Sequence, residues 1–533
     1  MFGSASLARL LICSVAVLQP LVLQLVSAHR EEYSPRDRNH VAARRWRRLQ
    51  EADAGAPPNL TAESTRVDIW PQIEERVTQQ GGFTEVADAL QAALDIAVEY
   101  NGAYGSGILR IESSDRDVGL LFAGASGNVK NNSDPSDEAT TYAMPFEIAS
   151  IGKMFTAAVI LQLRDEGLLD LDDTIAQYLS FSNQFVRPSE LSVTSEGGGF
   201  VIPASLHHYD GDIYTANLTI RELLSHTSGV VDYWELEEFW DDYEADADRY
   251  WFGVDTLIYP AEEEARFVPS DGSNFHYTDT AYVVLGLVIE RIEEKKLSQV
   301  YRERIFDPLR LNSTYSQYRE TRPSVKREVS RYAIEGGLGM VDMTNTLRNT
   351  AEWAGGCMAS DAGDLALFLF RLLNGSLVSL ESRQEMQRFD IGSPSYGLGL
   401  SKQTIETDEE TVTLLGHSGY GQAFAYFSPE LRVAITGSLN NNLNSANQLL
   451  EALVKALAYY NPKPINDDVI DDDPIDDDII RLPPGNTTQA QGSNNSSNGT
   501  AAGEAGGPNK GSAKGKGARA KEGEKDTRLR NRQ

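Results

Sequence analysis

The stretch Phe146-Glu-Ile-Ala-Ser150-Ile-Gly-Lys153-Met-Phe-Thr-Ala-Ala-Val-Ile160 places a serine and a lysine three residues apart at the start of an apolar helix. Residues at positions i and i+3 share one face of a helix, so the Lys153 amine can reach the Ser150 hydroxyl. The positive end of the helix dipole favours negative charge that develops there. A serine needs an adjacent base to become a nucleophile, and a lysine kept neutral by burial can serve. The pair alone is a weak indication, because two such common residues also occur together on exposed surfaces.

The chain around this helix predicts one folded core over residues 83–462. Apolar patterning predicts a first helix at 84–98, a closing helix at 445–457, and strands at 107–112, 118–124, 422–427 and 432–438. The section from roughly 165 to 390 is predicted to be mostly helix and loop. The expected fold class is therefore α/β (α+β), with one antiparallel sheet flanked by helices and a mainly helical lobe inserted between its halves. A cleft between lobes is a common place for an active site.

Two further segments place polar groups where such a cleft needs them. Tyr277 and Asp279 precede an apolar helix, where a turn can direct both at a ligand. The alternative is a capping turn, with Asp279 as the N-cap. The second segment, His417-Ser-Gly419-Tyr420, leads into a strand, and glycine there lets a substrate approach the backbone closely. The alternative is that His417 is a turn histidine whose hydrogen bonds are satisfied.

The order Ser-x-x-Lys, Tyr-x-Asp, His-x-Gly resembles the motifs of the class C β-lactamase-like serine hydrolases. That family includes penicillin-recognising D-Ala-D-Ala carboxypeptidases, D-aminopeptidases and family VIII-type esterases. Over roughly residues 140–440 the chain also resembles further hallmarks of the family, which are Leu223-Leu-Ser-His226-Thr-Ser-Gly229, Asp307-Pro-Leu309, Gly355-Gly356 and Tyr396-Gly-Leu-Gly399. The resemblance implies a β-lactamase/transpeptidase-like fold.

The resemblance also implies a role for each site residue. Ser150 would be the acylated nucleophile, and Lys153 and Tyr277 would share the general base and acid work. His417 takes the position of a lysine in true class C β-lactamases. The substrate and oxyanion residues would be Asp279, Gly419 and Tyr420, with the N–H groups of Ser150 and Tyr420 binding the oxyanion. His226 belongs to a hallmark with a structural role and is left outside the predicted catalytic set.

Two departures from the family pattern narrow the expected substrate. Asp279 stands where asparagine is commonest, and a carboxylate only accepts hydrogen bonds, which suits a substrate with an N–H or amine. His417 removes the fixed positive charge that would hold the carboxylate of a β-lactam. We expect a secreted serine hydrolase that cleaves an ester or a small amide or peptide bond through an acyl-serine intermediate. The alternative is a catalytically inactive binding or scaffold protein with the same fold.

No cofactor or metal is expected, because the seven histidines show no ligand-like spacing apart from the adjacent His207 and His208. The formal net charge of -30 argues against nucleic acid as a partner. Cys357 is the one cysteine beyond the leader, and its small neighbours predict a buried structural role.

The two ends of the chain predict export through the secretory pathway. Residues 1–28 have the form of a signal peptide, and no later segment is apolar enough for a membrane anchor. Residues 29–82 are a basic leader and linker, in which residues 30–48 are either a short propeptide that ends at Arg45-Trp-Arg47-Arg48 or a disordered basic segment. An acidic linker, 463–483, and a low-complexity tail, 484–533, follow the core, and the basic part of the tail suits anionic glycans or a cell wall. Sequons that predict glycosylation occur at Asn59, Asn131, Asn217, Asn312, Asn374, Asn486, Asn494, Asn495 and Asn498.

Overall fold

The computed structural model describes residues 86–460, apart from gaps at 101–104, 114–119, 131–133, 135, 185–200, 247, 270–272, 323–326, 336–338, 345, 376 and 442–445. The predicted signal peptide, basic leader, acidic linker and tail (1–28, 29–82, 463–483 and 484–533) lie outside the described residues. Within the described ranges, no helix has both the length and the apolar character needed to cross a membrane.

A six-stranded antiparallel sheet organises the core, with the strand order β12-β13-β14-β15-β1-β2. Its strands are β1 (Ser106–Ser113), β2 (Leu121–Gly127), β12 (Ser401–Glu406), β13 (Thr411–Gly419), β14 (Ala423–Ser428) and β15 (Val433–Ser438). The two ends of the core meet where β1 pairs with β15, with Ile108 opposite Ser438. The predicted sheet built from both ends of the core is thereby confirmed.

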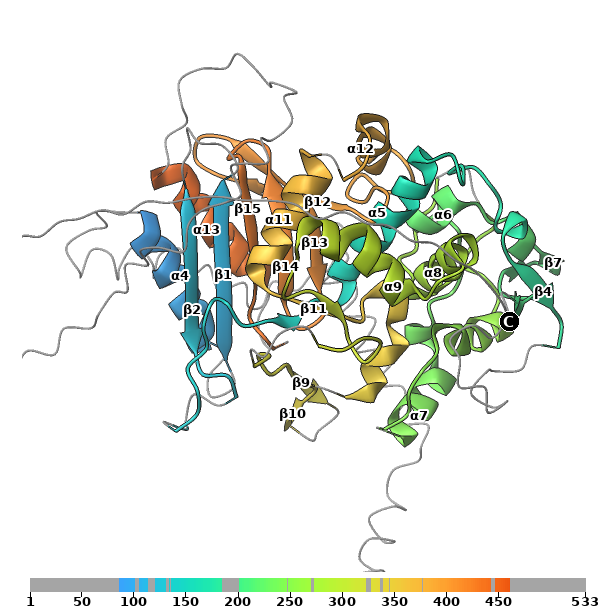
Figure 1. The fold of residues 1–533 in the computed structure, drawn as a ribbon, viewed down its shortest axis with the longest axis horizontal. Coiled ribbons are helices and arrows are strands. Elements are labelled where there is room, and N and C mark those ends of the chain that lie inside the picture. The colour runs from blue at the N-terminus through green and yellow to red at the C-terminus, as the bar shows by residue number, and fades with distance from the viewer. Residues whose placement is uncertain are drawn as a thin grey trace, which may run out of the picture. The chain divides into compact units, whose positions relative to one another are not determined.

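Helices cover both faces of this sheet (Figure 1). The N-terminal helix α4 (Val86–Tyr100) and the closing helix α13 (Ala446–Tyr460) pack on each other, and α4 lies against β1 and β2. On the opposite face, α11 (Ala362–Leu373) contacts β1, β14 and β15. Apolar residues recur at helical spacing in α4, where Leu90, Leu94 and Val98 are buried. The sheet is therefore enclosed between two helical layers.

A mainly helical lobe lies between β2 and β12 in the sequence, as predicted. Its helices are α5 (Gly152–Asp165), α6 (Ile220–Leu224), α7 (Glu237–Ala245), α8 (Asp279–Glu293), α9 (Leu297–Tyr301), α10 (Asp307–Leu309) and α12 (Leu380–Met386). Short strands connect them: β3 (Phe146–Glu147), β4 (Ser180–Ser182), β5 (Val201–Pro203), β6 (His208–Tyr209), β7 (Asp212–Ile213), β8 (Tyr315–Ser316), β9 (Tyr332–Glu335), β10 (Gly339–Asp342) and β11 (Met358–Ser360).

The serine-bearing helix α5 links the lobe to the sheet. It packs against α8 and against the 3-10 turn η11 (Trp353–Gly355), while the 3-10 turn η2 (Ala149–Ile151) that opens it contacts the end of β13. The rings of Phe155 on α5 and Phe368 on α11 stack at 3.7 Å between centroids. The predicted site segments are brought together where α5, α8, η11 and β13 meet.

Candidate active site

Ser150 lies in a tight turn at the start of α5. Ala149, the residue before it, has φ +45°, a left-handed conformation that a residue with a Cβ adopts only at a cost on the order of 1–3 kcal/mol. Strain of this kind persists where the surrounding structure determines the backbone, and it is frequent at functional sites. The turn leaves Ser150 half-buried, whereas Ile151 and the first residues of α5 are buried.

Glycines allow three backbone segments to meet at this turn. A Cβ on Gly419, at the end of β13, would lie 2.1 Å from the carbonyl oxygen of Ile148, and one on Gly356 would lie 2.6 Å from the carbonyl carbon of Ala149. A Cβ on Gly152 would lie 3.0 Å from Gly356 Cα. Gly419 was predicted to give a substrate access to the backbone, and the structure places it directly against the turn that carries Ser150.

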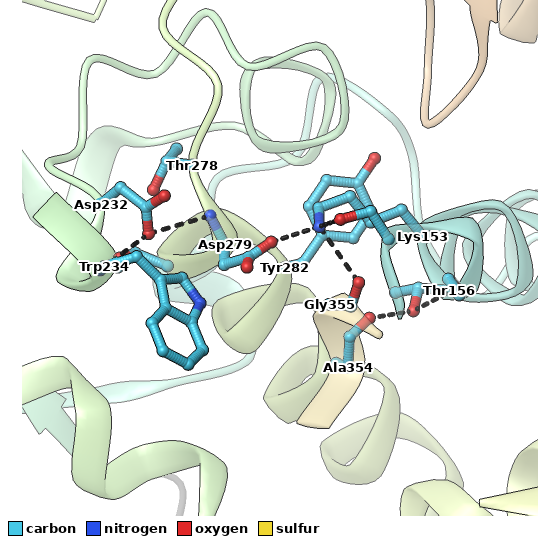
Figure 2. A network of polar contacts seen from close by, with 12 residues as sticks. Lys153, Thr156, Asp232, Trp234, Thr278, Asp279, Tyr282, Ala354 and Gly355 are labelled. Atoms are coloured by element: carbon cyan, nitrogen blue, oxygen red, sulfur yellow. Dashed lines mark hydrogen bonds and ion pairs between the residues drawn. The ribbon is translucent and has the colours of Figure 1, made fainter. Parts of the chain in front are cut away.

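Lys153 is completely buried, and its Nζ has three polar partners, of which Figure 2 shows Asp279 and Gly355. It forms an ion pair with the Asp279 carboxylate, donates to the Gly355 carbonyl oxygen at 3.0 Å, and lies 3.2 Å from Ser150 Oγ. The carboxylate balances the charge of the nitrogen, and the carbonyl, which can only accept, takes one N–H group. The second hydrogen-bonding partner of the nitrogen is the Ser150 hydroxyl. The nitrogen donates to Oγ as an ammonium, or accepts the hydroxyl proton as a neutral amine.

Asp279 is the first residue of α8, and the N-cap is Thr278 rather than Asp279. The capping alternative is thus not what the structure shows. The backbone N–H of Asp279 donates to Asp232 Oδ1 at 3.3 Å, and its carboxylate lies at the positive end of the helix dipole (Figure 2). Its carboxylate binds Lys153, whereas the sequence led us to expect it to face the substrate.

Tyr277 and Tyr420 complete the half-buried part of the site together with Ser150. The Lys153 Nζ lies 4.8 Å from the centroid of the Tyr277 ring, so the two residues expected to share the acid and base work are neighbours. The ring of Tyr420, just beyond β13, lies 5.5 Å from the guanidinium of Arg331. Ser150, Lys153, Tyr277 and Asp279 are therefore brought together, and Tyr420 follows the strand end that packs on them.

His417 is buried near the end of β13. The segment His417-Ser-Gly419, which was predicted to lead into a strand, belongs to β13 and precedes β14. Its Nδ1 lies 2.6 Å from the Ser418 carbonyl oxygen and its Nε2 lies 3.1 Å from the Tyr396 hydroxyl. Burial, with a contribution from Lys153, lowers the pKa of His417 to about 3. His417 is thus a neutral imidazole whose two nitrogens are both hydrogen-bonded within the protein.

Three residues near the site were not in the predicted set. Tyr396 and His226 are buried beside His417 and Tyr277, and their only indication in the sequence was membership of hallmark segments. Glu352 is half-buried, and its carboxylate lies 2.7 Å from where a Cβ on Gly356 would be. Burial raises the pKa of Glu352 to about 7, with Arg331 opposing. No pattern in the sequence distinguished this glutamate.

Among the described residues, no cluster of three or more histidine, cysteine, aspartate or glutamate side chains is placed to hold a metal ion. Cys357 is a free, buried thiol, and burial raises its pKa to about 12. The predicted structural role of this cysteine agrees with that position.

Comparison with known proteins adds the family. The family model described as Beta-lactamase matches residues 123–459. Among curated proteins, "Beta-lactamase-like protein 4" of Dictyostelium discoideum is 26% identical over 64% of this chain and 52% of its own length. "Penicillin-binding protein 4*" of Bacillus subtilis is 27% identical over 51% of this chain and 55% of its own length. The chain thus spans about half the length of the curated relatives it matches.

Solved structures show the same fold. A D-stereospecific amidohydrolase from Streptomyces sp. superposes with a TM-score of 0.55 and 25% identity, covering 69% of this chain and 98% of the other. A D-amino acid amidase from Ochrobactrum anthropi SV3 has a TM-score of 0.55 and 22% identity, with 70% and 99% covered. These likenesses confirm the predicted β-lactamase-like fold class. The family model covers well over half of the chain, and the chain therefore belongs to the β-lactamase family.

Proposed function

We propose that this protein is a serine hydrolase that cleaves an ester or a small amide bond through an acyl-serine intermediate at Ser150. The observation that carries the proposal is the hydrogen bond between Lys153 Nζ and Ser150 Oγ, which lie 3.2 Å apart. Because Asp279 and the Gly355 carbonyl also bind this nitrogen, the amine has little freedom to turn away.

In the first half of the proposed reaction, Lys153 reacts in the form that has lost its ammonium proton: this amine takes the proton of the Ser150 hydroxyl, and Oγ attacks the substrate carbonyl carbon. The carbonyl oxygen becomes an oxyanion between the N–H groups of Ser150 and Tyr420. Collapse of the tetrahedral intermediate breaks the bond to the leaving group, which takes a proton through Tyr277 from the Lys153 ammonium. In the second half, water attacks the carbonyl carbon of the acyl-serine and gives up a proton to Tyr277, from which a proton passes through Lys153 to Ser150 Oγ. The bond between Oγ and the acyl carbon breaks, and the acid is released.

The substrate class we propose is a small ester or amide without an anionic group beside the scissile bond. His417 supplies no fixed charge, because its pKa is lowered to about 3 and both of its nitrogens are hydrogen-bonded. The amide alternative is supported by the likeness to the D-stereospecific amidohydrolase from Streptomyces sp.. A β-lactam, which presents a carboxylate, fits this site less well.

The test is turnover of a panel of p-nitrophenyl esters, D-amino-acid amides and nitrocefin by the wild type and by Ser150→Ala. We expect the variant to lose turnover by about a thousandfold or more, since a nucleophile cannot be replaced by its partners. Ser205→Ala is the matched control, because Ser205 donates to the Ala261 carbonyl away from the site. A fluorophosphonate probe should label Ser150 in the wild type. Absence of both an adduct and turnover would favour the inactive scaffold instead.

We also propose that the protein is exported, on the strength of the signal-like segment 1–28 and the sequons. Expression of the full chain in a eukaryotic secretory host tests this. We expect the product in the medium, glycosylated, with a new N-terminus at or after residue 29. Retention of the intact chain in the cytoplasm would contradict the proposal.

A further inference from the structure

We propose that His226 and Tyr396 are positioning residues that lock His417 in one tautomer and tie the helical lobe to the strand end beside the nucleophile. The inference rests on the proposed hydrolase function, because the group being positioned belongs to that site. His226 follows α6 in the helical lobe, Tyr396 precedes β12, and His417 lies near the end of β13.

The hydrogen bonds among these residues run in a single direction. The backbone N–H of Thr278 donates to His226 Nδ1 at 3.1 Å, so Nδ1 carries no proton and Nε2 must carry one. That Nε2–H donates to the Tyr396 hydroxyl oxygen at 3.3 Å, which leaves the hydroxyl proton for His417 Nε2 at 3.1 Å. His417 then carries its proton on Nδ1 and donates to the Ser418 carbonyl oxygen at 2.6 Å. The Tyr396 hydroxyl also hydrogen-bonds the Tyr282 hydroxyl, but the Ser418 carbonyl can only accept, so His417 keeps its proton on Nδ1 and its Nε2 remains an acceptor.

The surroundings keep every member of this chain uncharged. His226, Tyr396 and His417 are 0%, 1% and 4% exposed, so water does not compete for their hydrogen bonds. Burial lowers the pKa of both histidines and raises the pKa of Tyr396. The titratable groups that face them are Lys153 from α5, Asp279 and Tyr282 from α8, and His276 and Tyr277 from the segment before α8. Protonation of either imidazole would place a second positive charge near Lys153.

The backbone of His226 is itself strained. Its φ is +58°, and its carbonyl oxygen accepts the N–H of His276 at 2.8 Å. Its ring lies 4.3 Å from the Tyr277 ring, between centroids. One side of His226 thus fixes the segment that carries Tyr277 and Asp279, and the other side reaches His417 through Tyr396. The chain sets the distance between the two motif segments that flank Ser150.

The experiment compares Tyr396→Phe and His226→Asn with the wild type. Phenylalanine keeps the ring and removes only the hydroxyl. Asparagine tolerates a positive φ and can still accept from Thr278, but it is too short to reach Tyr396. Tyr301→Phe is the matched control, because it removes a buried hydroxyl that is 2.6 Å from Thr156 Oγ1 and outside the chain. The measurements are kcat, KM, the pH profile of turnover, and histidine tautomers by ¹⁵N NMR.

We expect Tyr396→Phe and His226→Asn each to lower kcat by about 10- to 100-fold, as small displacements of positioned groups do, while KM changes little. In Tyr396→Phe the acid limb of the pH profile should move to higher pH, because His417 Nε2 is then free to take a proton. The double variant should be no slower than the slower single variant, since both break one chain. An unchanged kcat and pH profile, additive losses, or an equal loss in Tyr301→Phe would overturn the proposal.

The tautomers separate this proposal from the proposed function. If the wild type shows no Ser150-dependent turnover, the hydrolase function fails and the NMR result alone decides the positioning proposal. Protons on His226 Nε2 and His417 Nδ1 would support it. The opposite tautomer of either histidine, or a charged imidazole at pH 7, would overturn it.

Discussion

At the scale of the residue, the difference between aspartate and asparagine at position 279 matters because of what each can donate. An asparagine amide can turn its NH₂ toward Lys153, whereas a carboxylate can only accept. Asp279 therefore holds Lys153 by an ion pair, while the Lys153 nitrogen hydrogen-bonds the Gly355 carbonyl and the Ser150 hydroxyl. The side chain of Asp279 is only 9% exposed and that of Lys153 is fully buried, so the pair is poorly screened.

Replacement of Asp279 tests this arrangement through stability. Asp279→Ala leaves a buried ammonium without its counter-ion, and we expect the free energy of unfolding to fall by about 3–5 kcal/mol. Asp279→Asn keeps an acceptor and should cost less, about 1–3 kcal/mol. The partly exposed pair between Lys455 and Glu451 is the control, and Glu451→Ala should cost at most about 1 kcal/mol. Urea unfolding measures all three variants. Equal losses in Asp279→Ala and Glu451→Ala would contradict the prediction.

How far the sequence predicts the site depends on the distance along the chain between the interacting residues. Ser150 and Lys153 were paired correctly, because helical geometry fixes neighbours at i and i+3. The contact of Asp279 with Lys153 was missed, since it depends on how α8 packs beside α5 and η11. His226 was assigned a structural role only. Its link to His417 passes through Tyr396, and nothing in the local pattern of any of the three shows that link.

At the scale of the element, the end of β13 is positioned by its contact with the turn before α5. Strand β12 pairs with β13 only as far as Gly416, so residues 417–419 have β14 as a strand partner on one side and the turn that carries Ser150 on the other. Apolar periodicity predicted four of the six sheet strands, β1, β2, β14 and β15, and the helices α4 and α13, whereas β12 and β13 were not predicted. The packing of a strand end on a helix start was not predicted either, because it depends on the absence of a Cβ at Gly419, and Gly419 had been assigned to substrate approach.

Gly419→Ala should displace β13 from the turn η2, which carries Ser150. Its Cβ would overlap the Ile148 carbonyl oxygen at 2.1 Å, and we expect kcat to fall by about 10- to 100-fold. Gly437→Ala is closely matched, because its Cβ would lie 2.1 Å from the Ile108 carbonyl oxygen between β15 and β1, away from Ser150. Both variants should lose about 1–3 kcal/mol of stability. Only Gly419→Ala should lose turnover per folded molecule, as measured by kcat normalised to fluorophosphonate labelling. An equal loss of kcat in Gly419→Ala and Gly437→Ala would contradict this prediction.

At the scale of the whole molecule, buried histidines and buried glutamates have opposite effects on how the free energy of unfolding depends on pH. Burial lowers the pKa of His207, His226 and His417 from the ordinary value of 6.5, so the unfolded chain binds more protons below that pH. These histidines make the free energy of unfolding fall as the pH drops. Burial raises the pKa of Glu328 and Glu352 from 4.5 to about 7, so the folded chain binds more protons between those values. The glutamates make the free energy of unfolding rise as the pH drops from 7 to 4.5. The two effects oppose each other in that window, and we expect steep acid destabilisation only below it.

Glu352→Gln tests this balance. At pH 8 the wild type keeps a half-buried carboxylate ionised, so the variant should be more stable there. One pKa unit corresponds to about 1.4 kcal/mol, and with allowance for screening we expect a gain of about 1–3 kcal/mol. At pH 4.5 the wild-type carboxyl is protonated in the folded state, and the gain should largely disappear. Consequently the free energy of unfolding should fall more between pH 8 and pH 4.5 in the variant than in the wild type. The reason is that the variant lacks the proton uptake by Glu352 that opposes the effect of the histidines. Urea unfolding at the two pH values measures the difference, with the exposed Glu238→Gln on α7 as the control. A gain from Glu352→Gln that is the same at both pH values would show that the glutamate does not titrate with folding, and the offset would then have to come from Glu328 alone.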